Sequence, residues 1–363
     1  MMNIYRLIGW VCISFSFASQ AEFVLQETPE IIGEISVNTA DLCDVANNTK
    51  HYIESFPQDK FAVHAGEVIE GINVSRVVKT LDFLCQSPKS SSYSRDYLLQ
   101  HFDFYRWLPD KQQAHQLAEQ SNNAVKKRLL NNIPEKQIFI TKYYTKLLKA
   151  SDKPTAKFNQ ALYALPADEQ GMTLAEAEKN KQHLTRYQLT RQQIINGALL
   201  NNKLAQPLIW LTEEALHDVL LQGTGVVDIN GKKRYFNVHR NNGIAYDYTL
   251  GKREQSRYWY FAEVPSILGY GKTLAEKIAI KPDVTFAGNV KQLGLGKLFL
   301  INYLVDGKPV NNMGVLADQG GAFDNNLFQL DFLKGSYYGW KDYYQANKHL
   351  PDYANTWLML IKQ

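Results

Sequence analysis

Residues 314–335 constrain the fold of this chain more than any other part of its sequence. The stretch opens with an apolar run that ends on Asp318 and continues through the pair Gly320-Gly321. It then alternates between apolar and polar residues up to Asp331. An apolar run, a glycine turn and an alternating run together predict two β-strands joined by a tight crossover. The two carboxylates at the ends of these runs are the candidate chemical groups.

Asp331 stands among apolar residues, beside Leu330 and Phe332. Poor solvation at such a position raises the pKa of a carboxyl group toward that of a working general acid. Taken alone, an acidic residue is more often solvated or structural than catalytic. Asp318 also has a simpler interpretation, because an Asp before a glycine pair commonly accepts hydrogen bonds from nearby backbone N–H groups and fixes the turn.

The overall composition and the motifs argue against several classes of protein. The 363 residues carry a formal net charge of +4, which is too small to indicate a nucleic-acid partner. Gly271-Lys272-Thr273 ends like a phosphate-binding loop, but the earlier glycine that this motif requires is Ser266. The eight His residues show no metal-ligand spacing, and no nucleophile-elbow motif is present. We therefore expect neither a metal nor an organic cofactor.

The first 21 residues have the pattern of a secretory signal peptide. Arg6 precedes a short apolar run, and Ser19-Gln20-Ala21 forms a small-x-small cleavage site before Glu22. The alternative is an N-terminal membrane anchor, for which the apolar run is shorter than the ~20 residues that a span needs. Cleavage would leave an exported protein without an integral membrane span.

Two cysteines, Cys43 and Cys85, remain after signal removal, because Cys12 lies in the predicted leader. In an exported chain this favours one disulfide between them. The alternative is two buried free thiols.

The pattern of apolar residues predicts an α-rich N-terminal region over residues 22–132. Apolar residues recur at three- and four-residue spacing in residues 74–84 and 114–130, and Asn132-Ile133-Pro134 ends the pattern. Residues 136–148 are rich in Ile, Phe, Thr and Tyr, which is typical of a strand. Residues 226–229 and 234–238 indicate two further strands around the turn Asn230-Gly231.

From residue 136 to the C-terminus, the order and spacing of short motifs resemble the membrane-bound lytic transglycosylase A (MltA) family. The helix that starts after Thr190, a favourable N-cap, gives the strongest match. The matching residues are Thr141 with Tyr143-Tyr144, residues 189–194, Gly197-Ala198-Leu199, residues 221–225, residues 242–246 and residues 318–322.

The chain departs from the family pattern at several positions. Lys142 replaces a glycine, Thr145 an acidic residue and Asn289 an aspartate. Relative to the family, two residues are inserted around 324–326, and an even insertion preserves the facing of Asp331 in its strand. Aromatic residues at 337–344 replace small ones; they are candidates for stacking on sugars, although packing at the barrel end is the simpler interpretation.

The resemblance implies a mainly-β fold, in which a double-psi β-barrel is interrupted by a smaller inserted β domain and preceded by the α-rich region. The expected divisions are residues 1–21 (signal peptide), 22–132 (α-rich region), 133–170 (first part of the barrel), 171–264 (inserted domain) and 265–363 (remainder of the barrel with Asp331).

The resemblance also implies lytic exotransglycosylase activity on peptidoglycan. The β-1,4 bond between N-acetylmuramic acid and N-acetylglucosamine would be cleaved without water, leaving 1,6-anhydro ends, with Asp331 as the single general acid and then base. Thr141, Tyr143, Gln222, Thr224, Tyr246 and Asp318 are the expected substrate-binding residues. A structural hydrogen bond at a strand start is the alternative interpretation of Gln222.

The expected partners are glycan strands in the periplasm of a Gram-negative bacterium, with possible association with the outer membrane. Protein partners are not predicted. The alternative function is a catalytically inactive peptidoglycan-binding protein on the same fold.

Overall fold

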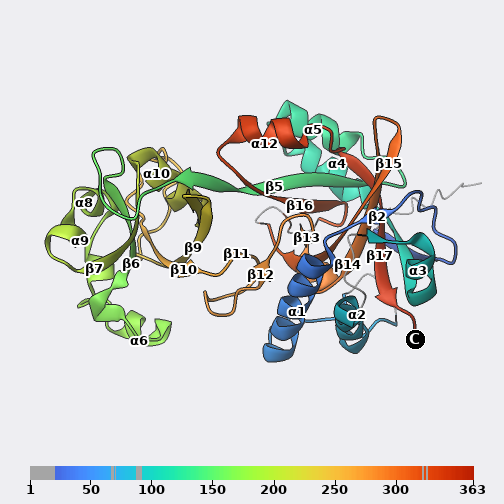
Figure 1. The fold of residues 1–363 in the computed structure, drawn as a ribbon, viewed down its shortest axis with the longest axis horizontal. Coiled ribbons are helices and arrows are strands. Elements are labelled where there is room, and N and C mark those ends of the chain that lie inside the picture. Colours follow the sequence, from blue (N-terminus) through green and yellow to red (C-terminus); the bar gives the residue numbers. More distant parts are fainter. Residues whose placement is uncertain (1–20, 67–68, 70, 87–91, 321–322, 324–325) are drawn as a thin grey trace, which may run out of the picture.

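In the computed structural model the chain forms two lobes, and strand β5 (Ile138–Lys149) runs from one into the other (Figure 1). The structure describes residues 21–66, 69, 71–86, 92–320, 323 and 326–363. The predicted signal peptide, apart from Ala21, and most of the apparent insertion at 324–326 lie outside these residues. No helix in the described part of the chain is long and apolar enough to cross a membrane.

Six strands of the larger lobe close into a barrel. Around the ring the order is β5, β17, β14, β15, β13, β16 and back to β5. The pairs β13–β15 and β16–β5 are parallel and the other four are antiparallel. The bounds are β13 Thr285–Ala287, β14 Leu298–Val305, β15 Lys308–Asp318, β16 Gln329–Tyr337 and β17 Tyr353–Ile361. The mainly-β barrel is confirmed, and its mixed pairing is consistent with the double-psi form.

The barrel closes around a continuous apolar core. Strand β14 is buried on both faces at its start, where Leu298, Phe299, Leu300 and Ile301 are at most 1% exposed. A strand covered on both faces has an unbroken apolar run instead of an alternating one. The connection from β15 to β16 differs from the predicted tight crossover. The two strands are not neighbours, because β13 lies between them in the sheet and pairs with both. Strand β16 begins at Gln329.

The N-terminal region is α-rich, as predicted, but it also extends the barrel sheet, because β4 pairs with β17 and β1 pairs with β4. The predicted helix over 114–130 is two helices, since Asn123 caps a new helix with its side chain. The elements are β1 Glu22–Gln26, β2 Ile35–Ser36, α1 Thr39–Ser55, α2 Val74–Gln86, β3 Ser92–Tyr93, α3 Arg95–His101, β4 Phe102–Leu108, α4 Lys111–Glu119 and α5 Ala124–Asn131.

The smaller lobe has a core of its own, whose buried residues range from Leu148 to Phe261. The far end of β5 enters it and pairs in parallel with β8. The domain divisions predicted from the sequence, with this domain at 171–264, stay a prediction. The elements are β6 Gln160–Pro166, the 3₁₀ turn Ala167–Glu169, α6 Leu174–Lys179, α7 Thr185–Gln188, α8 Arg191–Ile195, α9 Ala198–Asn201, β7 Ala205–Leu211, α10 Glu213–Gln222, β8 Thr224–Ile229, β9 Lys232–Asn241 and β10 Trp259–Val264.

Short elements complete the larger lobe: β11 Ile267–Leu268, β12 Ala279–Ile280, α11 Val290–Leu293 and α12 Trp340–Asn347.

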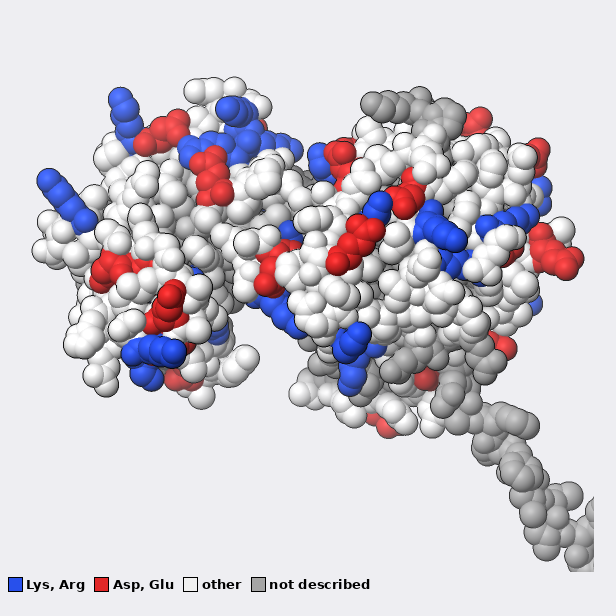
Figure 2. All heavy atoms as spheres, turned by 90° about the horizontal axis from the view of Figure 1, so that it is seen from below, with Lys and Arg blue, Asp and Glu red and all other residues white. Residues whose placement is uncertain are grey.

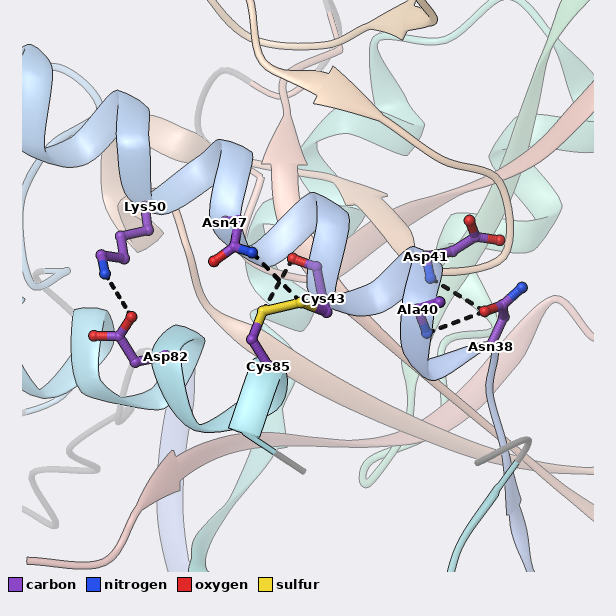
Figure 3. The surroundings of a disulfide bond; sticks show 8 residues. All are labelled: Asn38, Ala40, Asp41, Cys43, Asn47, Lys50, Asp82 and Cys85. Atoms are coloured by element: carbon purple, nitrogen blue, oxygen red, sulfur yellow. Dashed lines mark hydrogen bonds and ion pairs between the residues drawn. A yellow bond between two sulfur atoms is a disulfide. The ribbon is translucent and has the colours of Figure 1, made fainter. Parts of the chain in front are cut away.

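A disulfide joins α1 to α2 through Cys43 and Cys85, whose Cα atoms are 4.8 Å apart (Figure 3). The two helices pack together, and an ion pair of 2.5 Å between Lys50 Nζ and Asp82 Oδ1 links them a second time. Asn38 starts α1 by accepting two backbone N–H groups of its first turn. The helix pair is therefore fixed as one unit against the barrel.

We predict that the double substitution Cys43→Ser with Cys85→Ser lowers the free energy of unfolding by about 3–4 kcal/mol. The reason is that the bridge closes a loop between residues 42 positions apart and so restricts the unfolded chain. Urea unfolding of the oxidised protein and the double variant measures the difference. Reductant should destabilise the first and leave the second unchanged. A loss below about 1 kcal/mol would contradict the stabilising role.

Candidate active site

Four neighbouring strands place the candidate residues at one level of the barrel. Ala287 of β13 is the register partner of Asp318 in β15 on one side and of Asp331 in β16 on the other. Asp331 is in turn paired with Thr141 of β5. With strands about 4.8 Å apart, the two Asp Cα atoms lie roughly two strand spacings from each other. Residues from three separate segments of the sequence thus meet at this level.

Asp331 has the properties of a carboxyl group that holds a proton near neutral pH. Burial raises its pKa to about 7 and the Asp318 carboxylate adds to the rise, whereas the Thr141 hydroxyl and the Lys142 ammonium lower it. Its Oδ1 atom is buried without a hydrogen-bond partner among the described residues. An unpaired buried oxygen is costly in a folded protein, so its presence marks a group available to a ligand.

Asp318 is held by hydrogen bonds that Asp331 lacks. The Tyr143 hydroxyl donates to its Oδ2 at 2.9 Å, and the Gln319 backbone N–H donates to its Oδ1 at 2.8 Å. Burial raises the pKa of Asp318 to about 6, against the lowering effects of these two donors and of Lys277. The environments therefore separate the two carboxyl groups, with the lower pKa at Asp318.

Thr141 is fixed by a neighbouring side chain. Gln329 Nε2 donates to Thr141 Oγ1 at 2.6 Å, and Asn326 Nδ2 donates to Gln329 Oε1 at 2.8 Å. This short chain of bonds runs from the end of the β15–β16 connection into β5. It orients the hydroxyl beside Asp331.

The departures from the family pattern have local structural roles. Lys142 turns to the 350–352 segment, where its ammonium donates to Pro351 O at 2.5 Å and lies 3.7 Å from Asp352 Oδ1. Thr145 and Ser336 share a hydrogen bond of 2.7 Å between their hydroxyl oxygens, and Asn289 caps α11. Asp318, Asp331 and Thr141 keep their shared register with these three residues in place.

A small cavity of about 210 Å³ opens beside Asp318. It is lined by Gly269, Tyr270, Gly271, Lys277, Asp318, Gln319 and Gly320. On the face seen in Figure 2, the two lobes meet at a narrow waist with a recess between them, and charges of both signs are interspersed. Among the described residues, no group of three or more His, Cys, Asp or Glu side chains is arranged to hold a metal ion.

A known family model matches the part of the chain that includes most of the smaller lobe. Residues 139–253 match the sequence model of the MltA specific insert domain. Among curated proteins, none matches the chain significantly.

Solved structures resemble the chain over nearly its full length. Escherichia coli MltA with bound chitohexaose aligns with a TM-score of 0.53 and 14% identity, covering 94% of this chain and 95% of that one. A membrane-bound lytic murein transglycosylase from Agrobacterium tumefaciens aligns at 0.51 and 14%, covering 91% and 97%. MltA from Neisseria gonorrhoeae aligns at 0.52 and 15%, covering 90% of each chain. At these identities the likeness establishes the fold.

The chain has the MltA fold and carries the MltA insert domain. The family resemblance read from the sequence is thereby confirmed.

Three of the residues expected to bind substrate lie in the smaller lobe, whereas the paired carboxylates lie in the larger one. Gln222 ends helix α10, so it does not begin a strand, and its Oε1 accepts the Lys146 N–H at 3.2 Å. Thr224 Oγ1 accepts from Asn237 Nδ2 at 2.9 Å. Tyr246 lies in the 242–250 loop beside a cavity of about 570 Å³. No contact recorded among the described residues joins these three to Asp331 or Asp318.

Sequence reasoning missed the residues that complete the larger-lobe site. Ala287 aligns both carboxylates, and Tyr270 and Lys277 line the cavity. Ala287 carries no chemical signal of its own in the sequence. Tyr270 lies between two glycines, a pattern that marks a tightly placed loop.

We predict that Asp331 titrates with a pKa of about 7 and that Asp318→Asn lowers this pKa. The substitution removes a neighbouring negative charge that disfavours ionisation of Asp331. Lys142→Met should act in the opposite direction, because it removes a positive charge that favours ionisation. Carboxyl ¹³C NMR titration of the three proteins measures the shifts. An unperturbed value near 4 in the unsubstituted protein would refute the buried, charge-coupled site.

Proposed function

We propose that this protein is a lytic transglycosylase that cleaves the β-1,4 bond between N-acetylmuramic acid and N-acetylglucosamine in peptidoglycan. The observation that carries the proposal is Asp331, a half-buried carboxyl group whose Oδ1 is buried and unpaired among the described residues and whose pKa is raised to about 7, at a barrel site shared with Asp318. The MltA fold supports the same reaction, since its solved members are lytic transglycosylases by name.

A single acid suffices for this chemistry. Protonated Asp331 gives its proton to the glycosidic oxygen as the bond from that oxygen to C1 breaks. The C6 hydroxyl of the same muramic acid then attacks C1, and the Asp331 carboxylate accepts the hydroxyl proton. The C1–O6 bond replaces the C1–O4 bond, so no water is consumed and the product ends in a 1,6-anhydro ring. Attack from within the same sugar gains from proximity.

The difference between the two carboxyl groups assigns their roles. Asp318 ionises first, because the Tyr143 hydroxyl and the Gln319 N–H stabilise its anion. Its charge then helps to keep the proton on Asp331 until the glycosidic oxygen takes it. After the C1–O4 bond breaks and before the C6 hydroxyl attacks, the negative charge of Asp318 stabilises the positive charge at C1.

The ligand that fits this reaction is a glycan strand. The chitohexaose held by Escherichia coli MltA, whose fold this chain shares, supports binding of a β-1,4-linked polysaccharide. Thr141, the register partner of Asp331, and Tyr143 beside Asp318 are the substrate-facing candidates in the larger lobe, with Gln222, Thr224 and Tyr246 as candidate contacts on the smaller lobe. The predicted signal peptide and the proposed cell-wall substrate support a location in the periplasm of a Gram-negative bacterium. Release from strand ends, an exo mode, is part of the proposal.

We predict that Asp331→Asn lowers the release of anhydro-muropeptides from sacculi by at least about a hundredfold, because an amide neither donates to the leaving oxygen nor accepts the C6 proton. Mass analysis of digested sacculi measures the product. Asp342→Asn, at an exposed position on α12, is the matched control and should keep full activity.

The same experiment separates the two candidate functions. Activity of Asp331→Asn within about tenfold of the unsubstituted protein would remove Asp331 from the catalytic role. Binding to sacculi without product from the unsubstituted protein would favour an inactive peptidoglycan-binding protein.

We predict that Asp318→Asn keeps partial activity with an optimum at lower pH. An amide oxygen still accepts one of the two hydrogen bonds, while loss of the charge lowers the pKa of Asp331. Asp318→Ala should lower the free energy of unfolding by about 1–3 kcal/mol, because buried donors lose their acceptor. Activity–pH profiles and urea unfolding measure both effects. Complete loss of activity in Asp318→Asn with unchanged stability would instead make Asp318 a second catalytic carboxylate.

A further inference from the structure

Asp59, in the N-terminal region, is a buried carboxylate that joins helix α1 to the 269–278 loop through two hydroxyl donors and one ion pair. The residue is 3% exposed. Its Oδ2 accepts the hydroxyl of Tyr52 at 2.8 Å and the hydroxyl of Tyr270, also at 2.8 Å. The Lys272 ammonium lies 2.8 Å from its Oδ1 as an ion pair. Two of the three partners belong to the loop that lines the cavity beside Asp318.

The backbone of Asp59 is itself fixed. It lies in the turn that follows α1, where its carbonyl accepts the N–H of Val63 at 2.8 Å. Tyr52, one of its donors, comes from the last turns of α1, the helix tied to α2 by the disulfide. The carboxylate is therefore anchored to a rigid helix pair. Tyr270 and Lys272, which bind this carboxylate, are therefore held in a fixed position relative to the α1–α2 pair.

The 269–278 loop lies directly against the strand that carries Asp318. Tyr270 N–H donates to Ala317 O at 3.1 Å, and Ile278 N–H donates to Tyr270 O at 2.8 Å. A Cβ atom at Gly269 would lie 2.6 Å from Ala317 O, so this approach leaves no room for a side chain. A displacement of the loop would therefore reshape the cavity and move the backbone next to Asp318.

The Tyr270 ring is also packed, edge-on against Tyr52 with centroids 5.5 Å apart and stacked near Phe61 at 6.5 Å. The hydrogen bond from the Tyr270 hydroxyl to Asp59 adds a polar anchor at the far end of the ring, and a bond to a charged acceptor is stronger than a neutral one.

We propose that Asp59 is a positioning residue for the glycan site. Through Tyr270 and Lys272 it fixes the loop that forms the wall of the cavity beside Asp318. This inference rests on the proposed function for the identity of the ligand, a glycan strand. It also gives the α-rich N-terminal region a role in substrate binding that its sequence did not suggest.

The test uses Tyr270→Phe, which removes one hydroxyl and keeps the ring. Tyr303→Phe is the matched control, because its hydroxyl donates to Asn312 Oδ1 at 2.6 Å between β14 and β15 and takes no part in the bonds to Asp59. Hydrogen exchange of residues 269–278 and 317–320 is measured without substrate, and kcat and KM are measured on purified glycan strands. We expect Tyr270→Phe to speed exchange in both segments about five- to tenfold and to raise KM by a similar factor. The value of kcat should change less than about threefold, and the control should match the unsubstituted protein.

Substitutions at Asp59 provide the second arm. Asp59→Asn keeps an acceptor for the two hydroxyls and should hold KM within about threefold, whereas Asp59→Leu should raise it at least as much as Tyr270→Phe. Unchanged exchange in Tyr270→Phe, or faster exchange with an unchanged KM, would overturn the positioning role. Exchange requires no substrate, so a chain that yields no anhydro product refutes the proposed function while the loop anchor is still tested.

Discussion

Strand β5 is the element on which the rest of the structure depends. Within the barrel it is paired with β17 on one edge and β16 on the other, which closes the ring. Beyond the barrel the same strand continues into the second lobe and pairs with β8. Thr141 pairs with Asp331, the Tyr143 hydroxyl reaches Asp318 from two residues further along, and the Lys146 backbone N–H donates to Gln222 of the smaller lobe. One strand thus sets the geometry of the site and the attachment of the inserted domain.

The paired carboxylates show what the barrel supplies beyond scaffolding. Placing two acidic groups below the surface is unfavourable, since burial and mutual repulsion both oppose ionisation. The Tyr143 hydroxyl and the Gln319 N–H offset more of that cost at Asp318 than the Thr141 hydroxyl and the Lys142 ammonium offset at Asp331. At Asp331 the cost of burial is not fully offset, so its pKa is raised. Its Oδ1 atom also has no hydrogen-bond partner among the described residues. Burial of Asp331 is therefore unfavourable for stability, but it keeps this carboxyl group protonated up to a pH near its raised pKa of about 7.

The N-terminal region has a larger part in the barrel than its helical pattern indicates. Strands β1 and β4 extend the sheet beyond β17, and the α1–α2 pair fixes Asp59 beside the cavity loop.

The sequence by itself determined the local elements and the family. The strand character of β5, the Thr190 cap, the turn at Asn230-Gly231 and the apolar flank of Asp331 follow from short-range patterns, and the structure has each of them. Only the tertiary structure decided which residues meet. The insertion of β13 between β15 and β16, the bond from Tyr143 to Asp318 and the contact of Asp59 with Tyr270 join positions far apart in the chain. Local propensity carries no information on such partners, because burial and strand register are fixed only when the whole barrel closes.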